Sequence, residues 1–261
     1  MVEKVLGVIP ARYQSSRFPG KPLVEIMGVP MIKRTFLQAS KSRQLNDLVI
    51  ATDSDEIANY CKVEKMPYVM TSKDCLTGTD RVAEVSFNMA FDLYVNIQGD
   101  EPVIDPAGID QVVELFRVHG DSYAAFNLYK FLEDQTEIES DSIVKVITNE
   151  LDEVMYMSRL PVPFSKSGLQ QQYRQQVPVY AYTKEALDLF SASDKTINEK
   201  YEDVELLRFV DMGKKIKMAP TTVSTIAVDF PEDVKKVESF LRASNSINEA
   251  NFLANKKSFS G

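Results

Sequence analysis

Short apolar runs alternate with helical patterns through the first half of the chain, and this alternation restricts the fold more than any other feature. Three runs dominated by Val, Ile and Leu have the composition of buried strands: residues 4–9, 47–52 and 93–97. Helical patterns separate them, one of which begins at Asp53. Strands that are separated by helices form a parallel, doubly wound sheet, which binds its ligands at the carboxyl ends of the strands. The sequence therefore predicts an α/β fold with a ligand site at that edge.

The second half of the chain has a different character. Three further strand patterns are joined by turns rather than helices, at residues 143–147, 154–157 and 177–182. A last strand pattern at 224–229 precedes a helix that begins at Pro231. These patterns predict a mixed or antiparallel extension of the sheet.

Length and composition are sufficient for one large domain. The chain has 261 residues, of which 44% are apolar and 26% charged, an ordinary globular mixture. We expect residues 1–261 to form a single domain in which residues 150–215 are the extension. Because unpaired strand edges must be covered, the extension predicts a homodimer.

Several classes of protein are disfavoured by what the chain lacks. No apolar run is long enough to cross a bilayer, and the chain begins with a strand rather than a signal peptide. Cys61 and Cys75 form no C-x-x-C pair, which favours a reducing cytoplasm. His119 is the only histidine and is expected to end a helix, so a histidine-based triad is excluded. The net charge of −8 argues against nucleic-acid binding. Because the chain is acidic overall, an anionic ligand must meet locally gathered cations.

The loop after the first strand gathers such cations. Arg12, Arg17 and Lys21 lie in it, together with two serines and a Pro-Gly turn. Gly20 allows the backbone to approach a ligand closely, and the cations neutralise negative charge. The spacing matches neither G-x-G-x-x-G nor G-x-x-x-x-G-K-[ST], because Pro22 follows Lys21. The loop nevertheless suits the phosphates of a nucleotide.

Two aspartates follow predicted strands at the same edge of the sheet. Asp100 lies just beyond the strand at 93–97, and Asp229 ends the strand at 224–229. An aspartate at either position alone more often caps a turn or a helix. Together with the cationic loop, the pair forms the arrangement that holds Mg²⁺ on a triphosphate, because Mg²⁺ prefers a few carboxylates with phosphate oxygens and water.

Four blocks carry a more specific resemblance: the first loop, Gly78-Thr79-Asp80-Arg81, Gln98-Gly99-Asp100-Glu101-Pro102 and Val228-Asp229-x-Pro231-Glu232-Asp233. In order and spacing they resemble the CMP-Kdo synthetase family (3-deoxy-manno-octulosonate, or Kdo, cytidylyltransferases), from about residue 4 to about residue 240. The resemblance implies a doubly wound, mostly parallel α/β fold of the nucleotide-diphospho-sugar transferase type, with an antiparallel extension for dimerisation. It also implies Mg²⁺-dependent transfer of CMP from CTP to an acidic sugar, with release of pyrophosphate, for lipopolysaccharide or capsule precursors.

The resemblance also implies roles by position. The nucleotide would contact Pro10, Ala11, Arg12, Ser15, Arg17, Lys21, Arg81 and Gln98, and Mg²⁺ would bind Asp100 and Asp229. The catalytic residues would be Arg12, Lys21, Asp100 and Asp229. The cations would neutralise charge on the departing pyrophosphate, and the metal would orient the acceptor. Catalysis of this kind depends on positioning and electrostatics, so it needs no histidine base.

The acceptor side matches the family less closely. Arg159 lies in a block that resembles the family's Ser-Arg-x-x-Ile-Pro, whose arginine lies near the acid sugar. Gln176 stands where the family has a histidine, and Leu206 stands where it has a glutamine. By the resemblance, the acceptor would contact Arg159, Gln176, Tyr180, Tyr182 and Glu205. Kdo is the expected acceptor, and the two departures leave open an amino-Kdo, another ulosonic acid, or a phosphonate or phosphate acid.

Two interpretations from other classes are weaker. A non-catalytic nucleotide-binding homologue has no physical need to keep Lys21, Asp100 and Asp229 together. A nicotinamide-dependent dehydrogenase would carry G-x-G-x-x-G after its first strand, which this chain does not. The sequence favours a cytoplasmic enzyme whose partners are CTP and an acid, without nucleic acid or membrane.

Overall fold

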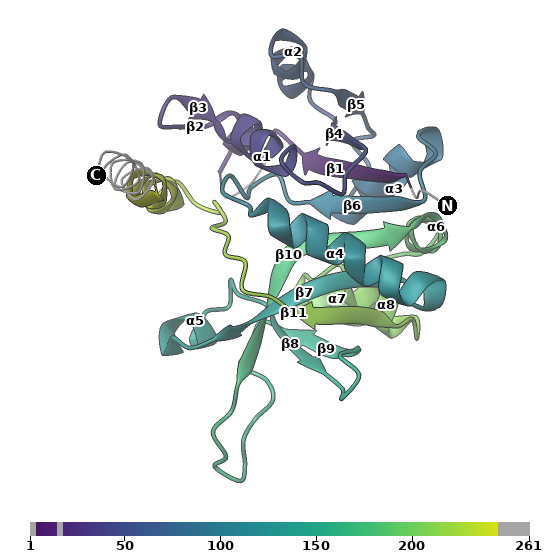
Figure 1. Cartoon of the computed structure of the whole chain (residues 1–261), viewed down its shortest axis with the longest axis vertical. Helices are drawn as coiled ribbons and strands as arrows, with labels where there is room; N and C mark the ends of the chain where they lie inside the picture. The colour runs from purple at the N-terminus through teal and green to yellow at the C-terminus, as the bar shows by residue number, and fades with distance from the viewer. Residues whose placement is uncertain (1–3, 15–17, 245–261) are drawn as a thin grey trace, which may run out of the picture.

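One sheet runs through both halves of the chain (Figure 1). The computed structural model describes residues 4–14 and 18–244, and within these ranges nine strands form this sheet. Its main path has the order β11-β7-β10-β6-β1-β4-β5, and β8 and β9 attach beside β10. The strands are β1 (Val5–Ala11), β4 (Asp47–Thr52), β5 (Tyr68–Met70), β6 (Leu93–Ile97), β7 (Ala125–Leu132), β8 (Lys145–Thr148), β9 (Val154–Ser158), β10 (Tyr173–Thr183) and β11 (Ile216–Pro220). A separate hairpin is formed by β2 (Glu25–Ile26) and β3 (Val29–Pro30).

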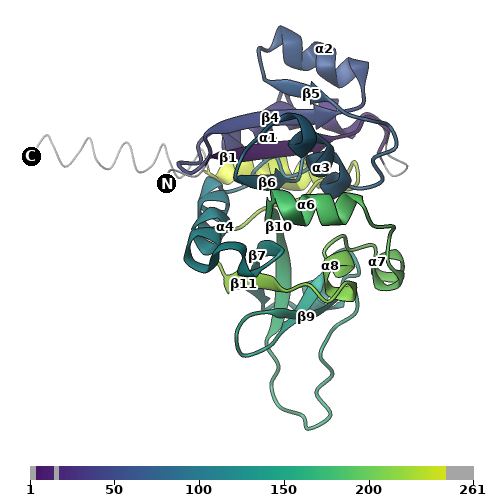
Figure 2. The same cartoon turned by 90° about the vertical axis from the view of Figure 1, so that its right-hand side faces the viewer.

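Helices cover both faces of the sheet (Figure 2). The helices are α1 (Met31–Ala39), α2 (Asp55–Val63), α3 (Gly78–Asn88), α4 (Pro106–His119), α5 (Gln135–Glu139), α6 (Lys184–Ser191), α7 (Ile197–Glu202) and α8 (Leu207–Asp211), with 3-10 turns η1 (Lys21–Leu23) and η2 (Gly120–Ser122). Ile32 of α1 and Val112 of α4 pack into the core on one face. Val82 of α3 and Leu187 of α6 pack into the core on the other. Among the described residues, no helix has both the length and the apolar composition to span a bilayer.

The strand directions confirm the predicted fold class. β1 pairs in parallel with β4 and β6, whose bounds coincide with the predicted runs at 47–52 and 93–97. β10 pairs antiparallel with β6 and β7, and β8 pairs antiparallel with β9. The antiparallel extension thus continues the parallel sheet. The carboxyl ends of β1, β4 and β6 lie along one edge, where a doubly wound sheet binds its ligands.

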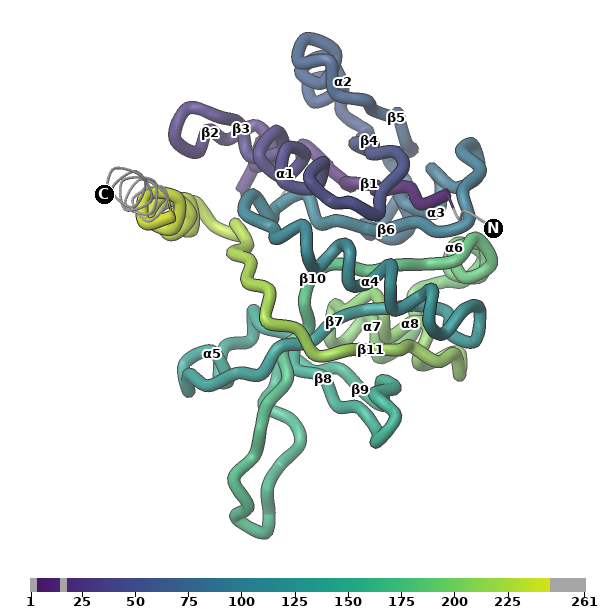
Figure 3. The backbone as a smooth tube through the Cα atoms, viewed as in Figure 1, coloured from purple at the N-terminus to yellow at the C-terminus, as the bar shows by residue number. Residues whose placement is uncertain are grey.

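Residues 224–229, which the sequence predicts as a strand, do not join the sheet. The last strand in the described chain is β11, which pairs in parallel with β7. Residues 221–230, which we call the strap, leave β11 as extended chain and return toward β2 and β3 (Figure 3). Ile226 and Val228 of the strap belong to a small separate apolar cluster with Met31 and Val237. The strand prediction was wrong because this cluster, rather than a neighbouring strand, accounts for the alternating apolar residues.

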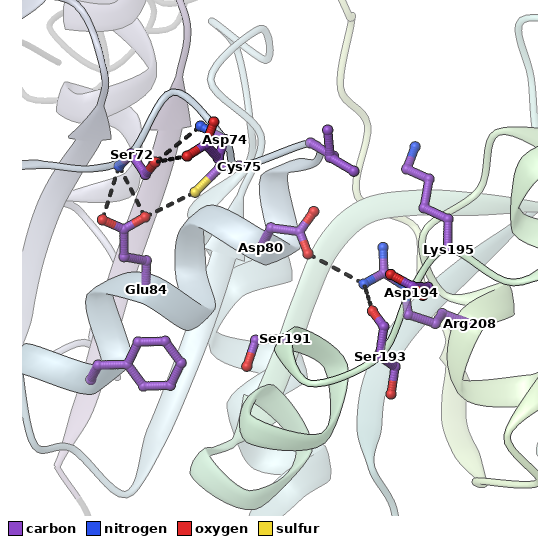
Figure 4. A pocket seen from close by; sticks show the side chains of 12 residues that line it. Ser72, Asp74, Cys75, Asp80, Glu84, Ser191, Ser193, Asp194, Lys195 and Arg208 are labelled. Carbon is purple, nitrogen blue, oxygen red and sulfur yellow. Dashed lines mark hydrogen bonds and ion pairs between the residues drawn. The ribbon is translucent and has the colours of Figure 1, made fainter.

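A buried charge cluster links α3 to the extension (Figure 4). The Arg208 side chain is 2% exposed, and its Nε and Nη2 each lie 2.7 Å from a carboxylate oxygen of Glu199. Its Nη1 lies 3.3 Å from Asp80 Oδ1, and its guanidinium carbon lies 3.6 Å from the centre of the Phe190 ring. Each buried charge is therefore offset by a partner, and removal of one partner would leave the other uncompensated.

We predict that Arg208→Met lowers the free energy of unfolding by about 3–5 kcal/mol, because Glu199 would remain buried without its counter-charge. Lys184→Met is the matched control, since it breaks the exposed pair of Lys184 with Asp188. The control is expected to cost about 0.5 kcal/mol or less. Urea denaturation of both variants at pH 7 measures the difference. Equal losses in the two variants would contradict the stabilising role of the buried cluster.

Candidate active site

A cleft of about 1300 Å³ borders the carboxyl ends of β1 and β6. One part of its lining, which we call the first-loop side, includes Pro10, Ala11, Arg12, Lys21, Gln98 and Asp100. The other part, which we call the extension side, includes residues 140–144, Arg159, Gln175, Gln176, Pro178 and Tyr180. The strap borders the cleft as well, through residues that include Asp229. Segments from both halves of the chain therefore enclose one site.

Three charged side chains from distant segments meet in this cleft. Lys21 begins η1 after β1, Asp100 follows β6, and Asp229 lies in the strap. The Lys21 Nζ lies 2.7 Å from Asp100 Oδ2 and 3.7 Å from Asp229 Oδ1. All three side chains are partly exposed, so a ligand in the cleft can reach them. The structure thus brings together the residues that the sequence singled out from the first loop and the two aspartate blocks.

The strap is attached on both sides of Asp229. The Val228 N–H donates to the Asp100 carbonyl at 3.0 Å, and the Thr225 hydroxyl donates to the Glu101 carboxyl group. On the other side, the backbone N–H of Asp229 itself donates at 3.1 Å to the carboxylate of Asp233, which lies beyond the strap. Residues 233–244 are helical and pack on the cluster around Met31. These contacts position Asp229 without a strand.

Glu101 is a buried carboxyl group that the sequence analysis did not single out. It is 3% exposed, and burial raises its pKa to about 8, with further contributions from the charges of Asp100 and Asp229. The hydrogen bond from Thr225 acts in the opposite direction. Near neutral pH, Glu101 therefore holds its proton and adds no third negative charge to the two aspartates. No pattern in the sequence distinguishes it from an exposed turn glutamate.

The two aspartates fit the ligand chemistry of Mg²⁺. This ion binds through one or two carboxylates, and phosphate oxygens and water complete its coordination. Asp100 and Asp229 supply two such carboxylates at the same place in the cleft, where the Lys21 ammonium already lies against them. In residues 4–14 and 18–244, no three Cys, His, Asp or Glu side chains converge as a metal site. A metal held here would therefore need ligands from a phosphate group as well.

The end of β1 forms the wall of the first-loop side. Pro10 and Ala11 are its last residues, and Arg12 follows as an exposed side chain on the cleft. A Cβ atom on Gly99 would lie 2.6 Å from the Pro10 carbonyl oxygen, so only glycine allows these two strand ends to approach so closely. Gln98 lines the cleft next to this contact. The predicted contacts Ser15 and Arg17 lie outside the described residues.

Arg81 borders the cleft, but its guanidinium is occupied by protein groups. It donates to the Thr71 hydroxyl, and its Nη2 lies 3.1 Å from Asp53 Oδ2. The helix that the sequence predicts to begin at Asp53 begins instead at Asp55 (α2), and Ser54 caps it by accepting from the Ile57 N–H. These contacts show Arg81 holding the segment before α3, and its nucleotide contact remains a prediction.

Glu205 and Tyr182 hold the N-terminal end of α3 through hydrogen bonds. Glu205 accepts from the Gly78 N–H at 3.0 Å, from the Thr79 N–H at 2.9 Å and from the Thr79 hydroxyl. The Tyr182 hydroxyl lies 3.1 Å from the same Thr79 hydroxyl, and Tyr182 is fully buried. Tyr182 is therefore a core residue rather than one that touches an acceptor. Glu205 does border the cleft, but its carboxylate is used at the helix N-terminus.

β10 bulges where it borders the cleft. Its register against β7 shifts between Val177 and Tyr180, around Pro178, which has no N–H to donate. Asn127 of β7 is fully buried, and its Nδ2 donates to the carbonyls of Val177 and Val179, both at 2.7 Å. A bulge changes the direction of nearby side chains, and here Pro178 and Tyr180 line the cleft. Asn127 therefore supports this wall of the cleft, a role that the sequence analysis missed.

The extension side contains the other predicted acceptor residues. The Arg159 guanidinium donates to three backbone carbonyls, those of Glu202 at 2.6 Å, Asp141 at 2.9 Å and Asp203 at 3.1 Å. Gln176 borders the cleft in β10. Leu206 also borders the cleft, although it is 1% exposed and packs in the apolar core. The expectation that Leu206 removes a polar group from the acceptor pocket stays a prediction.

Cys75 lies beside the cleft but is a poor nucleophile. Its sulfur lies 3.0 Å from Glu84 Oε2, and a dashed line joins the two side chains in Figure 4. Burial, together with the hydrogen bond to Glu84, raises the pKa of the Cys75 thiol to about 12. The thiol therefore stays protonated, which leaves the cleft without a cysteine nucleophile among its described residues.

Known proteins match this chain over most of its length. Residues 6–216 match the cytidylyltransferase family. The 3-deoxy-manno-octulosonate cytidylyltransferase of Solibacter usitatus (strain Ellin6076) is 38% identical over 94% of this chain and 97% of the relative. The 8-amino-3,8-dideoxy-manno-octulosonate cytidylyltransferase of Shewanella baltica (strain OS185) is 37% identical over 90% of this chain and 97% of the relative.

A solved structure gives the same result for the fold. CMP:2-keto-3-deoxy-manno-octonic acid synthetase, solved in complex with CTP, has a TM-score of 0.86 and 31% sequence identity to this chain. The match covers 92% of this chain and 99% of that structure. The resemblance carried by the four sequence blocks is thus confirmed, and the chain belongs to the cytidylyltransferase family.

Proposed function

We propose that this chain is a Mg²⁺-dependent cytidylyltransferase that transfers CMP from CTP to Kdo or a closely related acidic sugar and releases pyrophosphate. The observation that carries the proposal is the meeting of Lys21, Asp100 and Asp229 in one cleft. The relatives support CTP as the nucleotide and an octulosonate as the acceptor. The product would be a precursor of lipopolysaccharide or capsule, made in the cytoplasm.

The first-loop side would bind the nucleotide. Arg12 and Lys21 supply positive charge there, and Pro10, Ala11 and Gln98 form the adjacent wall. Positive charge stabilises the pyrophosphate as it departs, because negative charge accumulates on the leaving oxygen. Ser15 and Arg17 are further predicted contacts of the same loop.

The reaction would be an in-line displacement at the α-phosphorus. The anomeric hydroxyl of the sugar would lose its proton to the Asp229 carboxylate or to solvent, its oxygen would form the new bond to the α-phosphorus, and the bond to the pyrophosphate oxygen would break. Mg²⁺, when bound at Asp100 and Asp229, would polarise the α-phosphate. Lys21 neutralises phosphate charge from the same point, and the protonated Glu101 does not oppose it. The protein contributes positioning and electrostatics, so no covalent nucleophile is required.

The extension side would bind the acid. We assign the carboxylate of the acceptor to Arg159, since it borders the cleft and three backbone carbonyls already orient its guanidinium. Tyr180 and Gln176 add neutral hydrogen-bonding groups nearby. Burial raises the pKa of Tyr180, and the Glu205 carboxylate raises it further, so its hydroxyl remains a donor. Kdo and its 8-amino analogue are the two acceptors that the relatives favour.

We infer that residues 1–261 form a single domain whose extension, residues 150–215, also makes a homodimer. The loop between β9 and β10 projects away from the rest of the molecule (Figures 1 and 2). Phe164 on this loop is 87% exposed, and Leu160 and Leu169 are also exposed. Large apolar side chains gathered on one projecting loop are typical of an interaction surface. A second copy of the chain would cover them.

We predict that Asp100→Asn and Asp229→Asn each reduce turnover by roughly 100-fold or more, because each removes a negative charge that would hold the metal on the triphosphate. The substitutions hardly change the shape of the side chain, so the fold should persist. Initial rates of pyrophosphate release over a range of Mg²⁺ concentrations measure the effect. Asp121→Asn, an exposed site in η2, is the control. Near-normal turnover of both variants at saturating Mg²⁺ would refute the two-carboxylate site.

We predict that Arg159→Lys raises the KM of the acid by roughly tenfold, with a smaller effect on the KM of CTP, since charged hydrogen bonds contribute about 1.5–3 kcal/mol. Lysine keeps the charge but loses the planar fork. Arg174→Lys is the control, because Arg174 stacks on Tyr129 and does not line the cleft. Kinetics with Kdo and 8-amino-Kdo also reveal which acid is preferred. An equal rise in both KM values would remove Arg159 from the acceptor site.

For the dimer, light scattering at micromolar concentration should give twice the mass of one chain. Phe164→Asp should shift the protein toward the monomer, because it places a charge in the apolar interface. Val63→Asp alters a similarly exposed apolar residue on α2, outside the extension, and should have no effect. A wild-type protein that is monomeric under these conditions would contradict the inference.

A further inference from the structure

Lys145 is a fully buried lysine in β8 that the proposed reaction does not use. Its Nζ donates to the carbonyls of Ser140 at 2.6 Å, Ile143 at 2.8 Å and Arg159 at 2.5 Å. Within the described chain, no carboxylate lies at ion-pair distance from it. All three of its N–H groups are therefore matched with backbone oxygens, and burial lowers its pKa.

The three carbonyls belong to two segments that both border the cleft. Ser140 and Ile143 flank the turn between α5 and β8, and Arg159 directly follows β9. β8 and β9 are antiparallel neighbours, and Lys145 lies opposite Ser158 in their register. One ammonium group thus ties the turn to the end of the adjacent strand.

Arg159 completes the connection in the opposite direction. While its own carbonyl accepts from Lys145, its Nη1 donates to the carbonyl of Asp141, inside the turn that Lys145 holds. The two cations therefore fix each other's surroundings through backbone groups alone. A change at Lys145 would therefore affect Arg159 through two hydrogen bonds: the one from Lys145 to the Arg159 carbonyl, and the one from the Arg159 guanidinium to the Asp141 carbonyl in the turn.

A role in stability alone does not explain a lysine at this position. A buried charge without a carboxylate partner is costly, and an apolar side chain of similar length would fill the same space without that cost. What only the ammonium provides is three N–H donors directed at three carbonyls. The ammonium group therefore fits the positions of these three carbonyls in a way that an apolar side chain cannot.

We propose that Lys145 is a positioning residue that fixes the turn at residues 140–143 and Arg159 as one rigid wall of the extension side. This inference rests on the proposed function, in which that side holds the acidic acceptor. Lys145 itself touches no ligand, and it acts through Arg159. Its loss should therefore weaken acceptor binding and leave the binding of CTP on the first-loop side almost unchanged.

The test compares Lys145→Met with the wild type by steady-state pyrophosphate release and by hydrogen exchange. The KM of the acidic sugar should rise roughly tenfold and the KM of CTP less than about twofold, because the variant loses three hydrogen bonds on one side of the cleft only. Amide exchange should accelerate in peptides that cover residues 138–147 and 156–163. Lys145→Gln, which keeps neutral N–H donors, should give an intermediate result, and it replaces the methionine variant if that variant does not fold.

Two controls separate positioning from general destabilisation. Lys184→Met makes the same substitution on α6, outside the cleft lining. Leu187→Ala opens a cavity in the core on the other face of the sheet from α4. Neither control should change the KM of the acid differently from the KM of CTP.

Equal changes in the KM of the acid and of CTP in Lys145→Met, or unchanged exchange in both peptides, would overturn the inference. If the wild type releases no pyrophosphate with any acid, the proposed function fails, and the exchange data alone then decide whether Lys145 fixes this wall.

Discussion

The contact of the Lys21 ammonium with Asp100 and Asp229 is the interaction on which the site depends. It joins the segments after β1 and β6 to the strap at a single point. Two carboxylates this close repel each other unless a cation lies between them, so the cation favours this position of the strap. In the proposed enzyme, a bound triphosphate with Mg²⁺ would also neutralise the charges of Lys21 and the two aspartates. The phosphates would pair with Lys21, and the metal would pair with the aspartates.

The two sides of the cleft are built by different physical means. On the first-loop side, parallel strand ends place the functional groups, and Gly99 permits their close approach. On the extension side, Lys145 and Arg159 donate to backbone carbonyls of a turn, of the end of β9 and of the end of α7, and Asn127 holds the bulge in β10. This division is consistent with relatives that act on different octulosonates.

The sequence predicts the parallel strands well and the polar networks poorly. Continuous Val, Ile and Leu runs identify β4 and β6, and Asp100 is placed correctly because it directly follows such a strand. The strap was mistaken for a strand because its apolar residues pack on helix and hairpin residues. The buried positions of Tyr182, Leu206 and Glu101 depend on partners from distant segments, which no local pattern reveals. Family resemblance predicts which residues form the site, whereas the structure adds which of their side chains are buried or already bound to protein groups.

The nucleotide requirement of the reaction tests the proposed activity most directly. Purified protein is incubated with Kdo and each of the four nucleoside triphosphates, with Mg²⁺ or with EDTA, and pyrophosphate is measured. We expect release with CTP and Mg²⁺, formation of an equal amount of CMP-sugar, and little release with the other nucleotides or with EDTA. Equal release with another nucleotide, or release that continues in EDTA, would contradict a metal-dependent cytidylyltransferase built on Lys21, Asp100 and Asp229.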